Sequence, residues 1–185
     1  MPASNYVAID TVIFDLDGTL IDSEPDLRIA LNQLLTLLGR RPVTRDEVVM
    51  MVGDGVIKLV ERALRVVDAE GDVNLDTAVA KFLKFYEAAP ADLSTPFPGA
   101  FETVKTLKAH GIKLGVCTNK PEALAETLLC RLGVRDLFGA LVGAVGAGVG
   151  DTVGLIVGDM VGDSVGAGVG ATVGAGVGRT EMVGG

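Results

Sequence analysis

Glycine divides this chain of 185 residues into two parts of different chemical character. Sixteen of its 25 glycines fall between Gly139 and Gly185, and this stretch holds no aromatic residue, no lysine and one arginine, Arg179. Residues 1–138 hold the other nine glycines, all eight aromatic residues and 15 of the 16 basic residues. Glycine has no side chain to pack and costs about 0.5–1 kcal/mol inside a helix or strand. We therefore expect ordinary core-building sequence to end near Phe138.

The glycine-rich part is largely a tandem repeat of four residues. From Val145 to Thr180 the unit Val-Gly-x-x occurs nine times. In a helix the valine stripe would drift by about 40° per unit, and glycine disfavours both helix and strand. The sequence predicts that this C-terminal part is poorly ordered or structurally incomplete.

Charge and hydropathy limit the partners of the chain. Its 24 acidic and 16 basic residues give a net charge of -8 and a pI of about 4.6. Such a chain is not expected to bind nucleic acid or an anionic membrane, and a metal cation is the more natural charge partner. The longest uncharged runs have 14 and 15 residues, too few to cross a bilayer. The first residues lack the features of a signal peptide, so we expect a cytoplasmic protein.

The first elements are predicted with specific boundaries. The apolar run Thr11–Asp15 ends in an acidic turn, which is typical of a buried strand in a parallel sheet. Ser23 and Asp26 have the spacing of a capping box, and leucines at helical spacing follow until Gly39. We expect a helix there, with Ser23 as its N-cap.

Helical patterns continue for much of the chain. A second capping box spans Thr44–Glu47, and further helices are expected over 56–67 and 76–89. After residue 96 the pattern becomes helix, strand and helix, with the strand over Lys113–Cys117. The predicted fold class is therefore α/β, with a parallel sheet and a helical insertion.

Two carboxylates directly follow the first predicted strand. The segment reads Asp15-Leu-Asp17-Gly-Thr-Leu, at the sheet edge where open α/β sheets bind ligands. One aspartate can attack phosphorus while the other transfers protons. The simpler interpretation, a solvated acidic turn, is disfavoured because the segment follows a buried strand.

This segment resembles motif I of the haloacid dehalogenase superfamily. The stretches 20–23, 51–55, 98–99 and 118–121 also resemble those of bacterial phosphoglycolate phosphatases, so the resemblance covers about residues 9–141. It implies a Rossmann-like α/β core over 1–22 and 96–185, which includes the repeat at 145–180, and a helical cap over 23–95 that closes on the substrate.

The resemblance also implies roles for individual residues. Asp15 would be the nucleophile and Asp17 the general acid and base, and both would lie at the Mg²⁺ site. Gly18, Thr118 and Asn119 would bind the phosphate group.

Two further segments have competing interpretations. Gly53–Gly55 either lies on the substrate-facing turn of the cap or is a plain loop between helices. Lys120 is expected to be a solvated residue.

The resemblance breaks down after Lys120. No lysine follows it, so the motif III lysine is missing, and losing one such charge stabiliser costs on the order of 10²–10³ in rate. Asp159 and Asp163 have the form of motif IV and would complete the Mg²⁺ site. The alternative is coincidence, since a four-residue repeat imposes the same spacing on adjacent Val-Gly-Asp units.

Other nucleophiles fit less well. Neither cysteine has an arginine six residues later, as a cysteine phosphatase requires, because Ala123 and Asp136 stand there. We expect both cysteines to lie in the core and His110, the only histidine, to have no catalytic role.

The leading hypothesis is a Mg²⁺-dependent phosphatase of a small phosphorylated metabolite, most like 2-phosphoglycolate, with activity lowered by the missing lysine. The alternative is a catalytically inactive domain of the same fold whose Gly-x-x-x-Gly repeat mediates association. A repeat that arose by expansion or a change of reading frame is a third interpretation.

Overall fold

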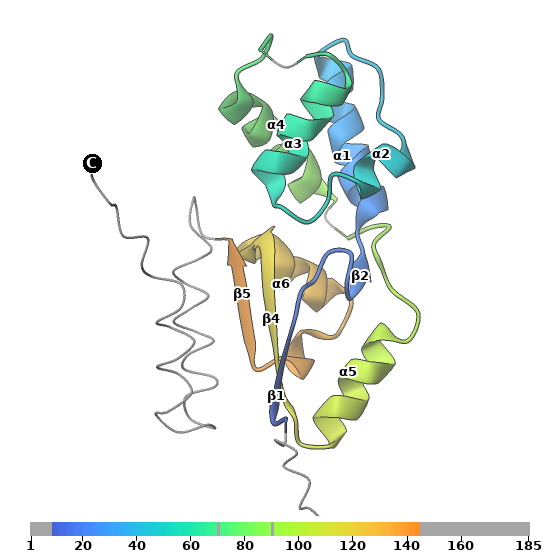
Figure 1. Ribbon diagram of the computed structural model, residues 1–185, viewed down its shortest axis with the longest axis vertical. Coiled ribbons are helices and arrows are strands. Elements are labelled where there is room, and N and C mark those ends of the chain that lie inside the picture. Colours follow the sequence, from blue (N-terminus) through green and yellow to red (C-terminus); the bar gives the residue numbers. More distant parts are fainter. Residues whose placement is uncertain (1–8, 70, 90, 145–185) are drawn as a thin grey trace, which may run out of the picture.

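The computed structural model describes residues 9–69, 71–89 and 91–144, so every prediction about the repeat falls outside the described residues. This part of the chain is an α/β structure with a parallel sheet, as predicted (Figure 1). In chain order its elements are β1 Thr11–Phe14, β2 Ile21–Asp22, α1 Glu24–Leu37, α2 Arg45–Val49, α3 Val56–Val66, α4 Leu75–Ala88, β3 Thr95–Pro96, α5 Ala100–Ala109, β4 Lys113–Pro121, α6 Glu122–Arg131, the 3₁₀ turn η1 Arg135–Leu137 and β5 Ala140–Ala144.

The main sheet has the strand order β1-β4-β5, and both pairings are parallel. Val12 lies opposite Leu114, and Cys117 lies opposite Val142. Because the strands are parallel, β1 and β4 end at the same edge of the sheet. The acidic segment after β1 and the polar end of β4 therefore lie close together.

Strand β5 was not expected, because core-building sequence was predicted to end near Phe138. Val142 is buried and pairs with the central strand β4. A Cβ atom on Gly143 would lie 2.4 Å from Cα of Glu122, the first residue of α6. Glycine is therefore required at this position, since it lets the strand approach the helix.

The four helices α1–α4 lie between β2 and β3 in the chain and above the sheet in Figure 1. They share a hydrophobic core in which Leu31, Val60 and Phe82 are fully buried. A second core, which includes Val116 and Leu128, joins the sheet to α5 and α6. The first core also includes Leu124 of α6, so the helical insertion packs against this helix of the sheet layer.

The helices predicted from leucine spacing and from glycine stops are confirmed. Helix α1 ends where Gly39 adopts φ +66°, and the N–H of Arg40 bonds back to the carbonyl of Leu35. This is the Schellman geometry that glycine favours at a helix end.

The predicted capping box of α1 is wrong. Ser23 occupies the N-cap position but its side chain makes no capping hydrogen bond, and it donates to Asp17 instead. Asp26 is buried and accepts hydrogen bonds from the backbone N–H groups of Leu93 and Ser94 and from the Ser94 hydroxyl. Ser23 thus bonds to the acidic loop before it, and Asp26 bonds to a segment 67 and 68 residues further along the chain, in place of local caps. A separate prediction, that both cysteines lie in the core, is wrong for Cys130, which is exposed.

The second capping box is confirmed. Thr44 Oγ1 accepts from the N–H of Glu47, and the Glu47 carboxylate accepts from the N–H of Thr44. Arg41 also pairs with that carboxylate at 2.8 Å. The hydrogen bond from Arg41, followed by the backbone bond from Thr44, lowers the pKa of Glu47 from 4.5 to about 2.

We expect Glu47→Gln to lower the melting temperature at pH 7. We also expect the melting temperature of this variant to fall less than that of the wild type as the pH is lowered. The folded pKa lies below the unfolded value, so the stability from Glu47 is present above pH 4.5 and is lost as the pH falls toward 2. Circular dichroism melts at pH 7, 4.5 and 3 measure this. Glu87→Gln, at an exposed site on α4, is the control. Equal acid sensitivity in the wild type and in Glu47→Gln would contradict the prediction.

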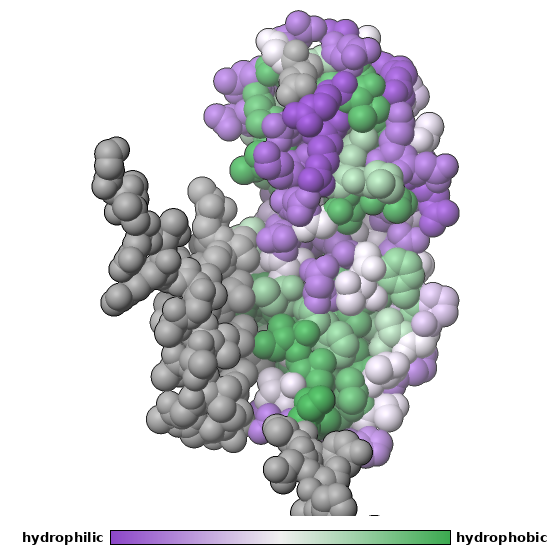
Figure 2. Space-filling view, viewed as in Figure 1, coloured by the Kyte–Doolittle hydropathy of each residue, from purple (hydrophilic) through white to green (hydrophobic). Residues whose placement is uncertain are grey.

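The surface differs between the two groups of elements. In Figure 2 hydrophobic residues gather over the sheet in the lower half of the view, whereas the helices above are mostly hydrophilic. No helix within the described residues is both long enough and apolar enough to span a membrane.

Candidate active site

The loop after β1 carries Asp15 and Asp17 at the carboxyl edge of the sheet. The fully buried Leu16 anchors it, because the Leu16 carbonyl accepts hydrogen bonds from three following N–H groups. Gly18 adopts φ +82°, and its N–H bonds to the Ile21 carbonyl at 2.9 Å. The turn exposes Asp15, whereas Asp17 is half-buried. The N–H of Gly18 serves the turn itself, and its predicted phosphate contact stays a prediction.

The Asp17 carboxylate is held from two sides. Ser23 Oγ donates to it at 2.5 Å, and Lys120 Nζ lies 3.2 and 3.3 Å from its two oxygens. Ser23 precedes α1, whereas Lys120 lies on β4. The carboxylate is therefore fixed by the start of the helical insertion and by the central strand.

Lys120 is buried, so the expectation that it is solvated is wrong. Only 4% of the residue is exposed, its Nζ donates to the Tyr86 hydroxyl at 2.7 Å, and it lies 4.5 Å from the centre of the Tyr86 ring. Burial opposes the ammonium charge, but Asp17 and Tyr86 outweigh it and raise the pKa of Lys120. The side chain is a charged group within the site.

Strand periodicity could have located Lys120. The predicted strand ended at Cys117, but β4 continues to Pro121. Residues two apart share a face of a strand, and Val116, Thr118 and Lys120 are all buried. No comparable signal identifies Tyr86, which reaches the site from α4 through tertiary packing.

The end of β4 also contacts the loop between α2 and α3. Asn119 Nδ2 donates to the Gly53 carbonyl at 2.9 Å. Gly55 has φ +85°, and a Cβ there would lie 3.2 Å from the Asn119 carbonyl oxygen. Asp54 forms an ion pair with Arg62. Gly53 and Gly55 thus lie directly over the strand end.

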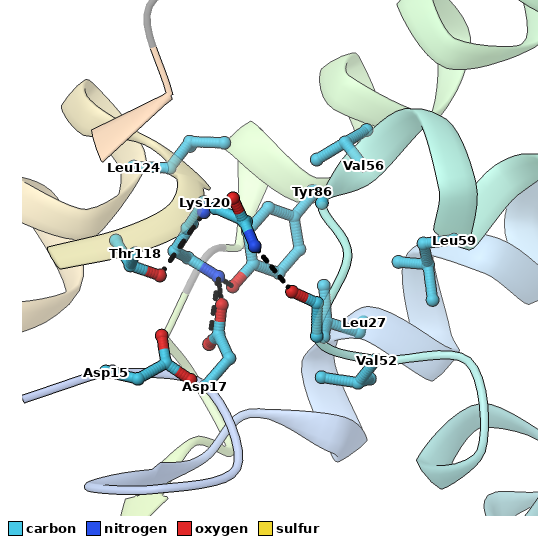
Figure 3. A pocket seen from close by; sticks show the side chains of 13 residues that line it. Asp15, Asp17, Leu27, Val52, Val56, Leu59, Tyr86, Thr118, Lys120 and Leu124 are labelled. Atoms are coloured by element: carbon cyan, nitrogen blue, oxygen red, sulfur yellow. Dashed lines mark hydrogen bonds and ion pairs between the residues drawn. The ribbon is translucent and has the colours of Figure 1, made fainter. Parts of the chain in front are cut away.

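Figure 3 shows the pocket that these groups enclose. Its polar side includes Asp15, Asp17, Thr118, Asn119 and Lys120. The remaining lining residues are apolar or aromatic apart from two glycines: Leu27, Val52, Gly53, Gly55, Val56, Leu59, Tyr86 and Leu124. The structure therefore brings four predicted site residues into one pocket, and Gly18 lies outside its lining.

The metal site is only partly within the described residues. Asp159 and Asp163 lie outside them, and the described part of the chain holds no cluster of three or more His, Cys, Asp or Glu side chains suited to a metal. Mg²⁺ prefers oxygen ligands and is commonly held by one or two carboxylates, waters and substrate phosphate. The exposed carboxylate of Asp15 and the neighbouring Asp17 fit that requirement.

A cysteine nucleophile does not fit this pocket. Cys117 lies near Asp15 on β4, where burial and the charge of Asp15 raise the pKa of its thiol. A thiol attacks as the thiolate, which these surroundings disfavour.

A parallel sheet with two aspartates at its carboxyl edge and helices over that edge defines an α/β protein with a polar ligand site. A family profile described as haloacid dehalogenase-like hydrolase matches residues 9–154. The chain belongs to this family of hydrolases.

Individual relatives agree with this assignment. A phosphoglycolate phosphatase of Caulobacter vibrioides is 42% identical over 133 residues, which are 71% of this chain and 56% of the relative. One from Cereibacter sphaeroides is 37% identical over 132 residues, 71% of this chain and 61% of the relative. The crystal structure of a predicted phosphoglycolate phosphatase from Haemophilus somnus 129PT has a TM-score of 0.68 at 30% identity, covering 73% of this chain and 62% of that one. The chain thus spans about three-fifths of the length of these proteins.

Proposed function

We propose that this protein hydrolyses a small phosphomonoester, 2-phosphoglycolate, through an aspartyl-phosphate on Asp15. The observation that carries the proposal is the exposed carboxylate of Asp15 in a pocket that also holds Asp17 and Thr118. The names of the relatives support the choice of substrate.

In the first step a carboxylate oxygen of Asp15 attacks phosphorus, and the bond from phosphorus to the ester oxygen breaks. Asp17 enters this step in its acid form and gives its proton to the leaving glycolate oxygen. Thr118 is buried beside the site, and its hydroxyl accepts a hydrogen bond from the N–H of Lys120. The hydroxyl hydrogen can then donate to a phosphate oxygen.

In the second step water attacks the phosphorus of the aspartyl-phosphate, and Asp17 takes the proton from that water. Phosphate leaves, and the carboxylate of Asp15 is restored. Ser23 and Lys120 both hold the Asp17 carboxylate in place. An acid and base that acts in both steps benefits from such fixed placement.

Asp15 and Asp17 would hold Mg²⁺ in this scheme, together with Asp159 and Asp163 if these form motif IV. When bound, the ion neutralises charge on the phosphoryl group as it transfers. The donor set on the described residues consists of hard oxygens, which suits this ion.

Residues 23–95 would act as a cap over the core formed by 1–22 and 96–185. The contact of Asn119 with Gly53 and that of Lys120 with Tyr86 join the two parts over the pocket. A closed cap excludes water from the reaction, and its opening would admit substrate.

The test is phosphate release from 2-phosphoglycolate by the full chain, with MgCl₂ and with EDTA. We expect release in MgCl₂ and none in EDTA. Release no greater than that of Asp15→Asn would refute the phosphatase proposal and favour the association alternative. Size-exclusion chromatography of the full chain and of a chain ending at Ala144 would then test that alternative.

A further inference from the structure

Lys120 is the only cationic side chain among the described residues that line the pocket. Its ion pair is with Asp17 at 3.2 Å, and the ammonium forms no such pair with Asp15 among the described contacts. The positive charge therefore lies beside the acid and base, in the pocket that Asp15 also lines.

All three N–H donors of Lys120 have partners, whereas the Tyr86 hydroxyl only accepts. An ammonium has three N–H donors, and here they meet the Asp17 carboxylate and the Tyr86 hydroxyl. The Tyr86 oxygen accepts from Lys120, and within the described chain no acceptor is found for its own proton. The contacts with Asp17, at 3.2 and 3.3 Å, are the longer ones, so a ligand carboxylate beside Asp17 can take over one of these donors and accept the Tyr86 proton with its other oxygen.

The chemistry of 2-phosphoglycolate places the carboxylate of the substrate close to Asp17 and Lys120. Asp17 must reach the ester oxygen to protonate it, and in 2-phosphoglycolate a single CH₂ group separates that oxygen from the carboxylate. Lys120 contacts the same Asp17, and the wall beyond it is apolar, with Leu27, Val56 and Leu59. Without Lys120, the two aspartates would repel a second negative charge on the substrate.

We infer that Lys120, together with the Tyr86 hydroxyl, binds the carboxylate of the substrate and selects phosphorylated short-chain acids over neutral phosphomonoesters. The inference rests on the proposed function and deepens it. Lys120 and Tyr86 are specificity residues in this account, whereas Asp15 and Thr118 serve the phosphoryl group.

The experiment compares two ligands that differ only at this point. Ethyl phosphate carries a methyl group where 2-phosphoglycolate carries its carboxylate. Binding is measured by calorimetry in MgCl₂ on the full chain with Asp15→Asn, which cannot turn the ligands over. A hydrogen bond to a charged group corresponds to about 10- to 100-fold in affinity, so we expect a preference of that order for 2-phosphoglycolate.

Adding Lys120→Met should reduce this preference to about twofold or less. The ratio of the two affinities is the readout, because the loss of Lys120 also leaves the Asp17 carboxylate without its cation, which affects both ligands. Tyr86→Phe keeps the ring stacked on Phe82, 5.9 Å between centroids, and should reduce the preference severalfold. Lys84→Met, at an exposed site on α4, should leave both affinities unchanged. Circular dichroism verifies the fold of each variant.

Equal losses on both ligands in Lys120→Met, or an unchanged preference in a folded Tyr86→Phe, would overturn the inference. No preference for 2-phosphoglycolate in the Asp15→Asn chain would overturn it as well. Failure of the proposed function is separate, because it appears as absent phosphate release by the wild type.

Discussion

Asp15→Asn is expected to lower phosphate release from 2-phosphoglycolate by a factor on the order of 10⁴ or more, as removal of a covalent nucleophile does in other enzymes. An amide is uncharged and cannot form the acyl phosphate. Because Asp15 is exposed at the end of β1, its replacement should leave the melting temperature within about 1 °C. Phosphate release in MgCl₂ and a thermal melt on the same sample measure both effects.

Two matched variants sharpen this comparison. Asp10→Asn changes an exposed aspartate at the opposite end of β1 and should keep phosphate release within about twofold of wild type. Asp17→Asn removes the acid and base and should lower phosphate release by a factor of about 10²–10⁴. Wild-type release by a folded Asp15→Asn chain would assign the nucleophile to another residue.

The residues that local sequence could identify are those whose placement depends on a single strand. Asp15 and Asp17 follow an apolar run, and Thr118 and Asn119 follow a second one. Parallel strands end at one edge, so the two strand patterns favour a shared position for these four residues, and all four line one pocket. The α/β class and the helix boundaries set by glycine were predictable for the same local reason.

The partners of Asp17 depend on tertiary structure and were not predicted. Ser23 fits a capping pattern, and only the packing of α1 against the acidic loop shows that its hydroxyl turns to Asp17. Tyr86 lies 34 residues before Lys120, so their contact depends on how the helices return over the sheet. Strand β5 was missed because Gly143 resembles a breaker until its approach to α6 is seen.

The second large effect is expected at the return of the helical insertion to the sheet. Asp26→Ala should destabilise the protein by about 2–4 kcal/mol, because it leaves the buried donors of Ser94 and the N–H of Leu93 without their acceptor. For a chain of this size that corresponds to a fall of roughly 5–15 °C in melting temperature. Urea unfolding and thermal melts measure it.

The neighbouring Asp92 provides the matched control. It pairs with Arg131 on the surface, and 59% of its side chain is exposed, so Asp92→Ala should cost no more than about 0.5–1 kcal/mol. Asp26→Asn keeps one carbonyl acceptor, so its loss in the free energy of unfolding should lie between the losses of the two alanine variants. Equal losses of stability in Asp26→Ala and Asp92→Ala would mean that the buried carboxylate does not hold the segment at Leu93 and Ser94 in place. The large difference expected here follows from burial, because water replaces a lost hydrogen bond at the surface but not at Asp26.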